Sequence, residues 1–190
     1  MAWKLKQKLT DNSFLGDKVA LRLANIPVKA ELRVIDAFHG ADTIWKNVQK
    51  KYDGSIKIFK IDKEQKDDSF VFPGDNKKYL SSLNLNNYDV VDLDAYGVPY
   101  DQMEIIFKKN YKGLVFITFI QNMSGCLPYD FLENLGYTKA MTKKCPTLFY
   151  KDGFKKMCAY LKLKGVEKIR YRTKNRKNYI CFSMPSALKL

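Results

Sequence analysis

Short apolar segments alternate with helical segments through the first two thirds of this chain, and this alternation constrains the fold more than any other feature. The predicted strands are Leu32–Phe38, Ser55–Ile61, Phe70–Phe72, Val90–Leu93 and Leu114–Ile120. Helices are expected over Ser13–Ile26, from the glycine turn to Tyr52, over Lys77–Leu83 and over Tyr100–Asn110. Such alternation requires right-handed crossover connections, which predict an α/β protein with a parallel sheet and helices on both faces.

The C-terminal part of the chain departs from this alternation. Two helices are predicted over Pro128–Leu135 and Leu148–Lys162. They are followed by strands over Glu167–Arg172 and Asn178–Met184, around a polar turn at Thr173–Lys177. This pattern predicts a β-hairpin, which makes the last strand antiparallel to its neighbour. At 190 residues the chain is too short for two comfortable domains. We therefore expect a basic arm at residues 1–12 and one seven-stranded domain over residues 13–190.

Cysteine and histidine are scarce, which limits the chemistry that the chain can perform. The four cysteines, Cys126, Cys145, Cys158 and Cys181, are widely separated, and the chain has one histidine. This spacing fits neither a zinc site nor a disulfide framework, so we expect no metal and reduced thiols in a cytoplasmic protein. No apolar run approaches the roughly 18 residues that span a bilayer. The first residues also lack the pattern of a secretory signal.

Positive charge is concentrated toward the C-terminus. The formal net charge is +14, and the residues from Lys139 onward contain 15 Lys or Arg but only two acids. Concentrated positive charge attracts polyanions through counterion release, so we expect nucleic acid as a partner. The residues predicted to contact phosphates are Arg172, Lys174, Arg176 and Lys177. A solvated hairpin tip is the alternative that the sequence leaves open.

Acidic residues follow the predicted strands at the edge where parallel sheets bind ligands. Asp36 lies near the end of the first strand, before the turn that contains Gly40, and Asp62 directly follows the second strand. The stretch YDVVDLDAYGVPY places Asp92 and Asp94 at the end of the fourth strand, on the same face by strand alternation. Each acid alone also suits a turn or a helix cap. Several of them at one sheet edge predict a site.

These features resemble the class I S-adenosylmethionine-dependent methyltransferases, whose Rossmann-like sheet has five parallel strands closed by an antiparallel terminal hairpin. The segment VIDAFHGAD is similar to the first motif of that family, and DLDAYG is similar to its fourth motif. Locally, DVVDLDAYGVP is similar to the Asp-Leu-Asp-Pro-Phe-Gly-Ser-Pro stretch of the tRNA guanine N2-dimethyltransferases. The local similarity covers eleven residues, whereas the general layout covers nearly all of the chain.

The resemblance implies S-adenosylmethionine as the cofactor. The positions that it assigns to the cofactor are Asp36, Phe38, His39, Gly40, Asp42, Asp62, Asp75 and Asp92. Among these, Asp62 matches the acid that holds the ribose, and Asp75 stands where the family often contacts the adenine amine. His39 is interpreted as flanking the cofactor in preference to acting as a base. Asp42 departs from the pattern, because a second glycine is common at that position.

The resemblance also implies a role for the fourth motif. Asp94 and the carbonyl of Ala95 would accept the N–H bonds of an exocyclic amine, while Tyr96 would stack on the base. Ala95 departs from the family, which has a proline there.

We therefore expect a methyltransferase acting on an exocyclic amine of a nucleic-acid base, with tRNA-like RNA favoured over DNA. The alternative is a methyltransferase-like fold that binds nucleic acid without catalysis, which the departures at Asp42 and Ala95 favour. A nicotinamide-binding domain is disfavoured by the terminal hairpin and by the single glycine in the turn. The sequence identifies neither the base nor the oligomeric state.

Overall fold

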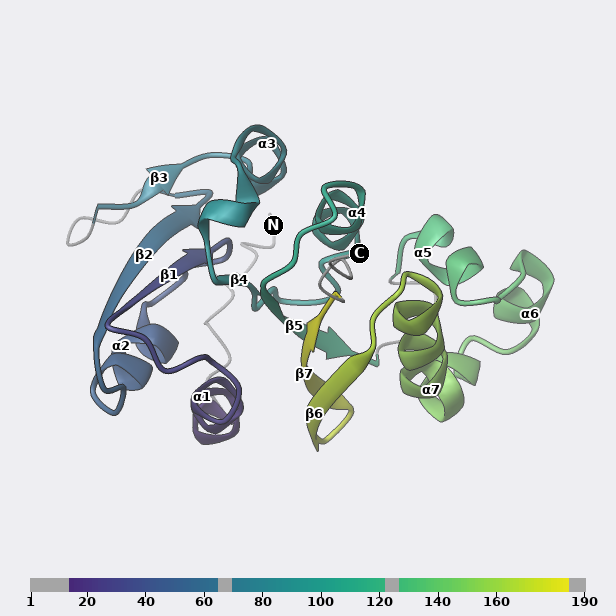
Figure 1. Cartoon of the computed structure of the whole chain (residues 1–190). Helices are drawn as coiled ribbons and strands as arrows, with labels where there is room; N and C mark the ends of the chain where they lie inside the picture. The colour runs from purple at the N-terminus through teal and green to yellow at the C-terminus, as the bar shows by residue number, and fades with distance from the viewer. Residues whose placement is uncertain (1–13, 65–69, 122–126, 185–190) are drawn as a thin grey trace, which may run out of the picture.

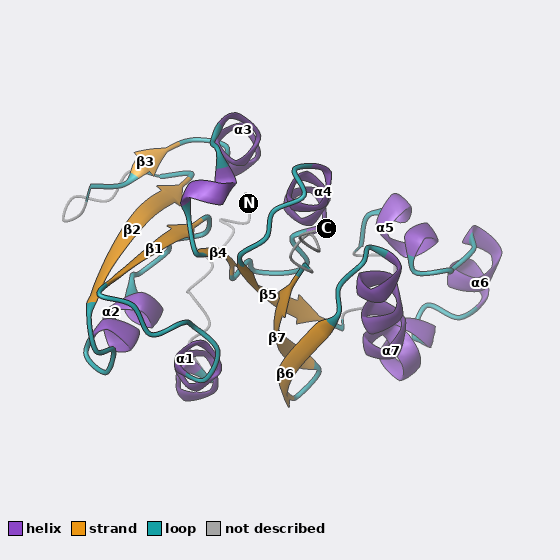
Figure 2. Cartoon of the chain, viewed as in Figure 1, coloured by secondary structure: helices purple, strands orange, loops and turns teal. Residues whose placement is uncertain are grey.

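A seven-stranded sheet forms the centre of the molecule, with helices packed on both of its faces (Figures 1 and 2). The computed structural model describes residues 14–64, 70–121 and 127–184. The predicted arm of residues 1–12, Ser13 and Cys126 lie outside these ranges. Within them, no helix has the length and apolar character needed to cross a membrane.

The sheet has the strand order β3-β2-β1-β4-β5-β7-β6. The strands are β1 Glu31–Asp36, β2 Ser55–Asp62, β3 Phe72–Pro73, β4 Val90–Leu93, β5 Leu114–Ile120, β6 Lys168–Lys174 and β7 Lys177–Ser183. Neighbours from β3 to β5 are parallel, whereas β7 is antiparallel to both β5 and β6. The predicted parallel core with a terminal antiparallel hairpin is confirmed.

The helices follow the predicted order, with two additions. They are α1 Leu15–Leu23, α2 Thr43–Gln49, α3 Asn76–Ser82, the 3-10 turn η1 Leu85–Asn87, α4 Tyr100–Lys108, α5 Tyr129–Asn134, α6 Lys139–Lys144 and α7 Leu148–Leu163. The sequence analysis did not predict η1 or α6. None of the α6 residues is buried, so this helix has no apolar periodicity by which it could be recognised.

Two hydrophobic clusters hold the helices against the sheet. On one face, Val19 of α1 and Trp45 of α2 pack with Val34, Val90 and Phe116 of the strands. Trp45 belongs to this core, and 1% of its surface is exposed. Burial of a large apolar side chain contributes about 1.5–3 kcal/mol, so these contacts fix α1 firmly beside the ends of β1 and β4.

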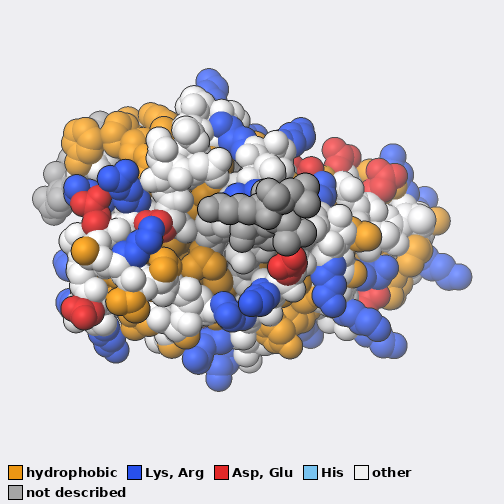
Figure 3. Space-filling view, viewed as in Figure 1, with side chains coloured by type: hydrophobic (Ala, Val, Ile, Leu, Met, Phe, Trp, Pro, Cys, Tyr) orange, Lys and Arg blue, Asp and Glu red, His pale blue; other side chains and the backbone are white. Residues whose placement is uncertain are grey.

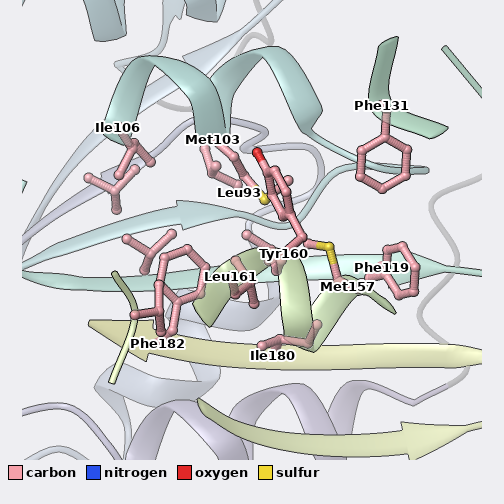
Figure 4. Close-up of a cluster of buried hydrophobic side chains, with 14 of the residues drawn as sticks. Leu93, Met103, Ile106, Phe119, Phe131, Met157, Tyr160, Leu161, Ile180 and Phe182 are labelled. Carbon is pink, nitrogen blue, oxygen red and sulfur yellow. The ribbon is translucent and has the colours of Figure 1, made fainter. Parts of the chain in front are cut away.

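The opposite face is covered by α4 and α7, whose side chains meet over the middle of the sheet (Figure 4). Met103 and Ile106 of α4 and Met157 and Leu161 of α7 gather there above Ile180 of β7. All five side chains are fully buried. Because apolar clusters cover both faces of the sheet, its polar groups lie mainly at the carboxyl edge of the parallel strands.

The terminal hairpin turns more tightly than the sequence analysis predicted. The turn expected over Thr173–Lys177 consists of Asn175 and Arg176, while Lys174 and Lys177 pair with each other as the last residues of the two strands. Asn175 and Arg176 have φ angles of 46° and 63°. Two-residue hairpin turns with positive φ at both central residues match the twist of the flanking strands, which explains why β-pairing continues into the polar segment.

Candidate functional site

A cavity of about 370 Å³ lies at the carboxyl ends of the parallel strands. Most of the predicted site residues line it, namely Asp36, Phe38, His39, Gly40, Asp42, Asp62, Asp92, Asp94, Ala95, Tyr96 and Lys177. The other predicted residues, Asp75, Arg172, Lys174 and Arg176, lie outside the lining. The structure also brings Lys18, Asn76, Thr118 and Tyr179 to the cavity, and the sequence analysis named none of these four.

The turn after β1 is closed by hydrogen bonds to two acids. His39 Nδ1 lies 3.0 Å from Oδ2 of Asp36, and because an ionised carboxylate only accepts, the ring donates from Nδ1. Gly40, with φ 56°, donates its N–H to Oδ2 of Asp62 over 2.9 Å. Asp62 also accepts the N–H of Glu64 at 3.3 Å. Asp62 therefore fastens the turn after β1 to the end of β2, and His39 is a buried part of the turn.

Asp42 places a carboxylate at the start of α2. Its backbone is left-handed, with φ 55°. Oδ2 lies 2.9 Å from Nζ of Lys60 and 4.0 Å from Nε2 of His39. Oδ1 is buried and accepts no hydrogen bond from any described residue. Lys60 thus supplies a positive charge that balances the carboxylate introduced at this position.

Asp75, which the resemblance assigned to the adenine amine, caps a helix, and the residue after it faces the cavity. Asp75 is exposed and caps α3, where its side chain accepts the N–H of Lys77 at 2.9 Å. The next residue, Asn76, faces the cavity and donates from Nδ2 to the carbonyl of Ala37 at 2.8 Å. An acid just before a helix is a common N-cap, and this pattern in the sequence would have pointed to Asn76 as the inward residue.

Asp92 is held by the protein itself. Arg22 of α1 donates to both of its oxygens, from Nε and Nη2, at 2.7 Å each. Trp45 donates from Nε1 to Oδ2 at 2.8 Å. Burial raises the pKa of Asp92 to about 6, and Arg22 partly offsets this effect. The three donors fill much of the acceptor capacity of the carboxylate, so its geometry is that of a buried structural ion pair.

Asp94 lies two residues further along and also faces α1. Lys18 Nζ lies 2.6 Å from its Oδ2, and the two side chains are each 9% exposed. Thr118 of β5 donates its hydroxyl to Oδ1. Lys18 is also within 5.4 Å of the ring centre of Tyr179, and burial raises the pKa of Tyr179 to about 12. Asp94 therefore has a fixed orientation at the cavity, with both oxygens bonded to protein side chains.

The two residues after Asp94 lead out of the cavity. The N–H of Ala95 donates to the carbonyl of Leu93 over 2.7 Å, which makes a tight turn directly after β4. Ala95 is buried, whereas Tyr96 is 68% exposed. Tyr96 thus presents a largely open aromatic ring at the rim.

The basic residues of the hairpin have different surroundings. Arg172 Nη1 lies 3.2 Å from Oδ1 of Asp17 on α1. Arg176 lies over the ring of Tyr150, 4.2 Å from its centre. Lys174 is exposed, and Lys177 lines the cavity. These four residues therefore differ in their partners, and contact with phosphates stays a prediction for each of them.

The two basic residues of α1 are the largest omission of the sequence analysis. Lys18 and Arg22 are four residues apart and fall in the same helical stripe as Leu15 and Val19. A charged residue on the buried stripe of an amphipathic helix requires a partner of opposite sign. Two basic residues on this stripe, together with two acids on one face of a strand, were the features of the sequence that could have predicted these ion pairs.

Comparison with solved structures places this arrangement in a known fold. An S-adenosylmethionine-dependent methyltransferase from Archaeoglobus fulgidus superposes with a TM-score of 0.52 and 13% identity, over 91% of this chain and 97% of its own. Human N-acetylserotonin methyltransferase, solved in complex with S-adenosylmethionine, gives 0.51 and 14% identity, over 92% of this chain and 53% of its own. A possible exported protein from Bordetella parapertussis gives 0.59 and 11% identity, over 92% and 68%.

No protein-family model matches the sequence, and a search of curated proteins gives no match. At these identities the structural likeness shows the fold, which is the Rossmann-like fold of class I S-adenosylmethionine-dependent methyltransferases. The local resemblance to tRNA guanine N2-dimethyltransferases stays a prediction.

Proposed function

We propose that this protein is an S-adenosylmethionine-dependent methyltransferase. The observation that carries the proposal is the cavity at the carboxyl ends of β1, β2 and β4, in a fold shared with solved methyltransferases. Open parallel sheets bind ligands at this edge. A volume of about 370 Å³ lies within the range of small-molecule sites.

The residues around the cavity fit the parts of S-adenosylmethionine. Asp62 lines the cavity, and backbone N–H groups of Gly40 and Glu64 hold its carboxylate in place, at the end of β2 where the ribose hydroxyls would lie. Asp36 gives the turn after β1 a negative charge that suits the ammonium group of the methionine moiety, whereas the charge of Asp42 is already balanced by Lys60. Asp92 is committed to Arg22, so its contribution is to hold the cavity floor.

When bound, the cofactor supplies an activated methyl group for an in-line displacement, for which the protein provides position and electrostatics. Asp94 keeps one lone pair on each oxygen after bonding to Lys18 and Thr118. These lone pairs can accept N–H bonds of an exocyclic amine and increase the electron density on its nitrogen. Lys18 lies beside the carboxylate and balances its negative charge, and the exposed ring of Tyr96 can stack on the same base.

We propose a base of nucleic acid as the methyl acceptor, with RNA favoured over DNA. The net charge of +14 supports a polyanionic substrate. The resemblance of DVVDLDAYGVP to the tRNA guanine N2-dimethyltransferases supports RNA. A base within a duplex would have to be flipped out to reach the cavity, which single-stranded or loop regions avoid.

Transfer of a tritiated methyl group from S-adenosylmethionine tests this function. Separate pools of RNA and DNA would be incubated with the wild type, with Asp94→Ala and with the control Asp53→Ala, which changes an exposed acid. We expect label in RNA, a loss of at least about 100-fold in Asp94→Ala and no change in the control. If both pools stay unlabelled although the protein binds the cofactor, a nucleic-acid acceptor is excluded.

One observation favours a second function, that of a nucleic-acid-binding protein without catalysis. Both oxygens of Asp94 already have protein partners, and Asp42 adds a carboxylate where the related fold often has glycine. Under this alternative the protein binds RNA in a salt-sensitive way but does not bind S-adenosylhomocysteine.

A further inference from the structure

The edge strand β6 carries basic side chains at alternate positions. Lys168, Arg170, Arg172 and Lys174 occupy every second residue of the strand, and all four are exposed. Successive side chains of a strand point to opposite faces, so these four share one face of the sheet. At about 3.3 Å per residue, the basic row spans roughly 20 Å.

The basic row lies on the face of the sheet that α1 covers. Arg172 contacts Asp17 of α1, and the strand register pairs Arg172 with Tyr179, which belongs to the cluster beneath α1. The alternate residue Tyr171 points to the other face, where its ring meets that of Phe154 on α7 at 4.7 Å between centres. The basic row therefore lies on one face of the sheet, whereas α7 and its lysines lie on the other face.

The charge of the basic row is largely uncompensated. In the described part of the chain, Arg172 pairs with Asp17, and no ion pair forms at Lys168, Arg170 or Lys174. Figure 3 shows Lys and Arg side chains gathered over the lower part of the view, where α1 and the β6–β7 hairpin lie. Uncompensated charge of one sign attracts ligands of the opposite sign.

The basic row leads to the cavity. Lys174 lies opposite Lys177 in the hairpin register, and Lys177 lines the cavity. Tyr179, which faces Arg172 across the hairpin, lines it as well. A ligand that follows β6 along this face therefore reaches the same opening that exposes Tyr96.

We propose that the basic row, together with Lys177, is a track for the sugar-phosphate backbone of single-stranded RNA, which delivers a base to the cavity. The groups are spaced in a line and do not converge on one point, which suits a linear polyanion and not a single phosphate ion. The role of the cavity rests on the proposed function, whereas the binding of RNA to the row does not.

The expected salt dependence follows from the number of charges. For single strands, the logarithm of the binding constant falls with the logarithm of salt concentration with a slope of about −0.7 for each phosphate contact. Four contacts along the row thus give a contribution of about −2.8. Replacing all four residues by glutamine should flatten the slope by this amount and weaken binding at least about tenfold at low salt.

Fluorescence anisotropy with a labelled single-stranded RNA of about 12 nucleotides, over a salt series, tests the proposal. The test variant is K168Q/R170Q/R172Q/K174Q. The matched control K143Q/K144Q/K151Q/K155Q removes two exposed lysines from α6 and two from α7, with the same change of net charge. We expect weak binding and a flat slope for the test variant only. Melting curves establish that both variants are folded.

Several results would overturn the track. Equal weakening in both variants would show that binding depends on net charge and not on the basic row, and unchanged binding in the test variant would exclude the row. If the test variant instead loses binding only to phosphatidylserine vesicles, the row is a membrane-contact surface. Titration with S-adenosylhomocysteine separates the two proposals, because row-dependent RNA binding without cofactor binding would refute the proposed function and leave the track.

Discussion

Replacing Arg22 by methionine tests whether Asp92 is held by the fold in the way described. Arg22 and Asp92 are 3% and 1% exposed in their side chains and share two hydrogen bonds of 2.7 Å. Methionine fills a similar volume without charge, so the variant leaves a buried carboxylate with only Trp45 as a donor. Removing one partner of a buried ion pair costs about 3–5 kcal/mol. For a chain of this size, that loss lowers Tm by about 6–20 °C.

The same variant should change how stability depends on pH. The pKa of Asp92 is raised to about 6, above its ordinary value, so the folded state binds this proton more tightly than the unfolded state. Stability from this group therefore falls as pH rises between about 4 and 6. Without Arg22 the pKa rises further, so the fall continues to pH 7. Between pH 6 and 7, Arg22→Met should lose about 1 kcal/mol more than the wild type.

Urea unfolding at pH 5, 6 and 7 measures both effects. The matched control is Arg33→Met, since Arg33 is exposed and its ion pair with Glu31 lies at the surface. Exposed pairs contribute about 0–1 kcal/mol, so the control should stay close to the wild type at each pH. A loss below about 1 kcal/mol in Arg22→Met at pH 7, or a pH dependence parallel to that of the wild type, would refute the reasoning.

Four further substitutions give three separate tests. Lys18→Met removes the cation beside Asp94 and should lower the methyl-transfer rate at least about tenfold. The Kd of S-adenosylhomocysteine, measured by calorimetry, should stay within threefold of the wild-type value. An unchanged rate would show that Lys18 has no role in the site. Gly113→Ala places a Cβ 2.6 Å from the carbonyl oxygen of Asp89 and should lower the free energy of unfolding in urea by at least about 2 kcal/mol. By contrast, the Cβ of Gly16→Ala meets nothing within 4 Å, so this variant should stabilise α1 by about 0.5–1 kcal/mol. Equal effects at the two glycines would contradict this packing. Arg176→Gly removes the backbone strain of a non-glycine residue at φ 63° and should raise Tm by a few degrees. A lower Tm would show that the contact of Arg176 with Tyr150 contributes more than this strain costs.

The fold could be predicted because local patterns and long-range packing agree. The predicted bounds of β4 and β5 match the structure, since both are short apolar runs ended by polar residues. By contrast, Lys174 was assigned to a turn because polar residues on an edge strand give no burial signal. The helix α6 was not predicted for the same reason, since none of its residues is buried in the core.

The site could be predicted only in part because its acids follow the strands while their partners lie far away in sequence. Strand alternation placed Asp92 and Asp94 on one face, and the structure shows both turned toward α1. Their partners Arg22 and Lys18 are 70 and 76 residues distant. Such pairs depend on how α1 packs against β4, which no local pattern specifies. The sequence therefore indicates which acids lie at the site, but not which of them are already bonded to other side chains of the protein.

Calorimetric titration of S-adenosylhomocysteine tests the central claim most directly. The wild type, Asp62→Ala and the control Asp53→Ala would be compared under one set of conditions. Asp62 lines the cavity and joins β2 to the Gly40 turn, whereas Asp53 is exposed in the turn after α2. We expect binding with one site per chain in the wild type and control, and at least about tenfold weaker binding in Asp62→Ala. Absence of binding in the wild type, or equal binding in all three proteins, would contradict it.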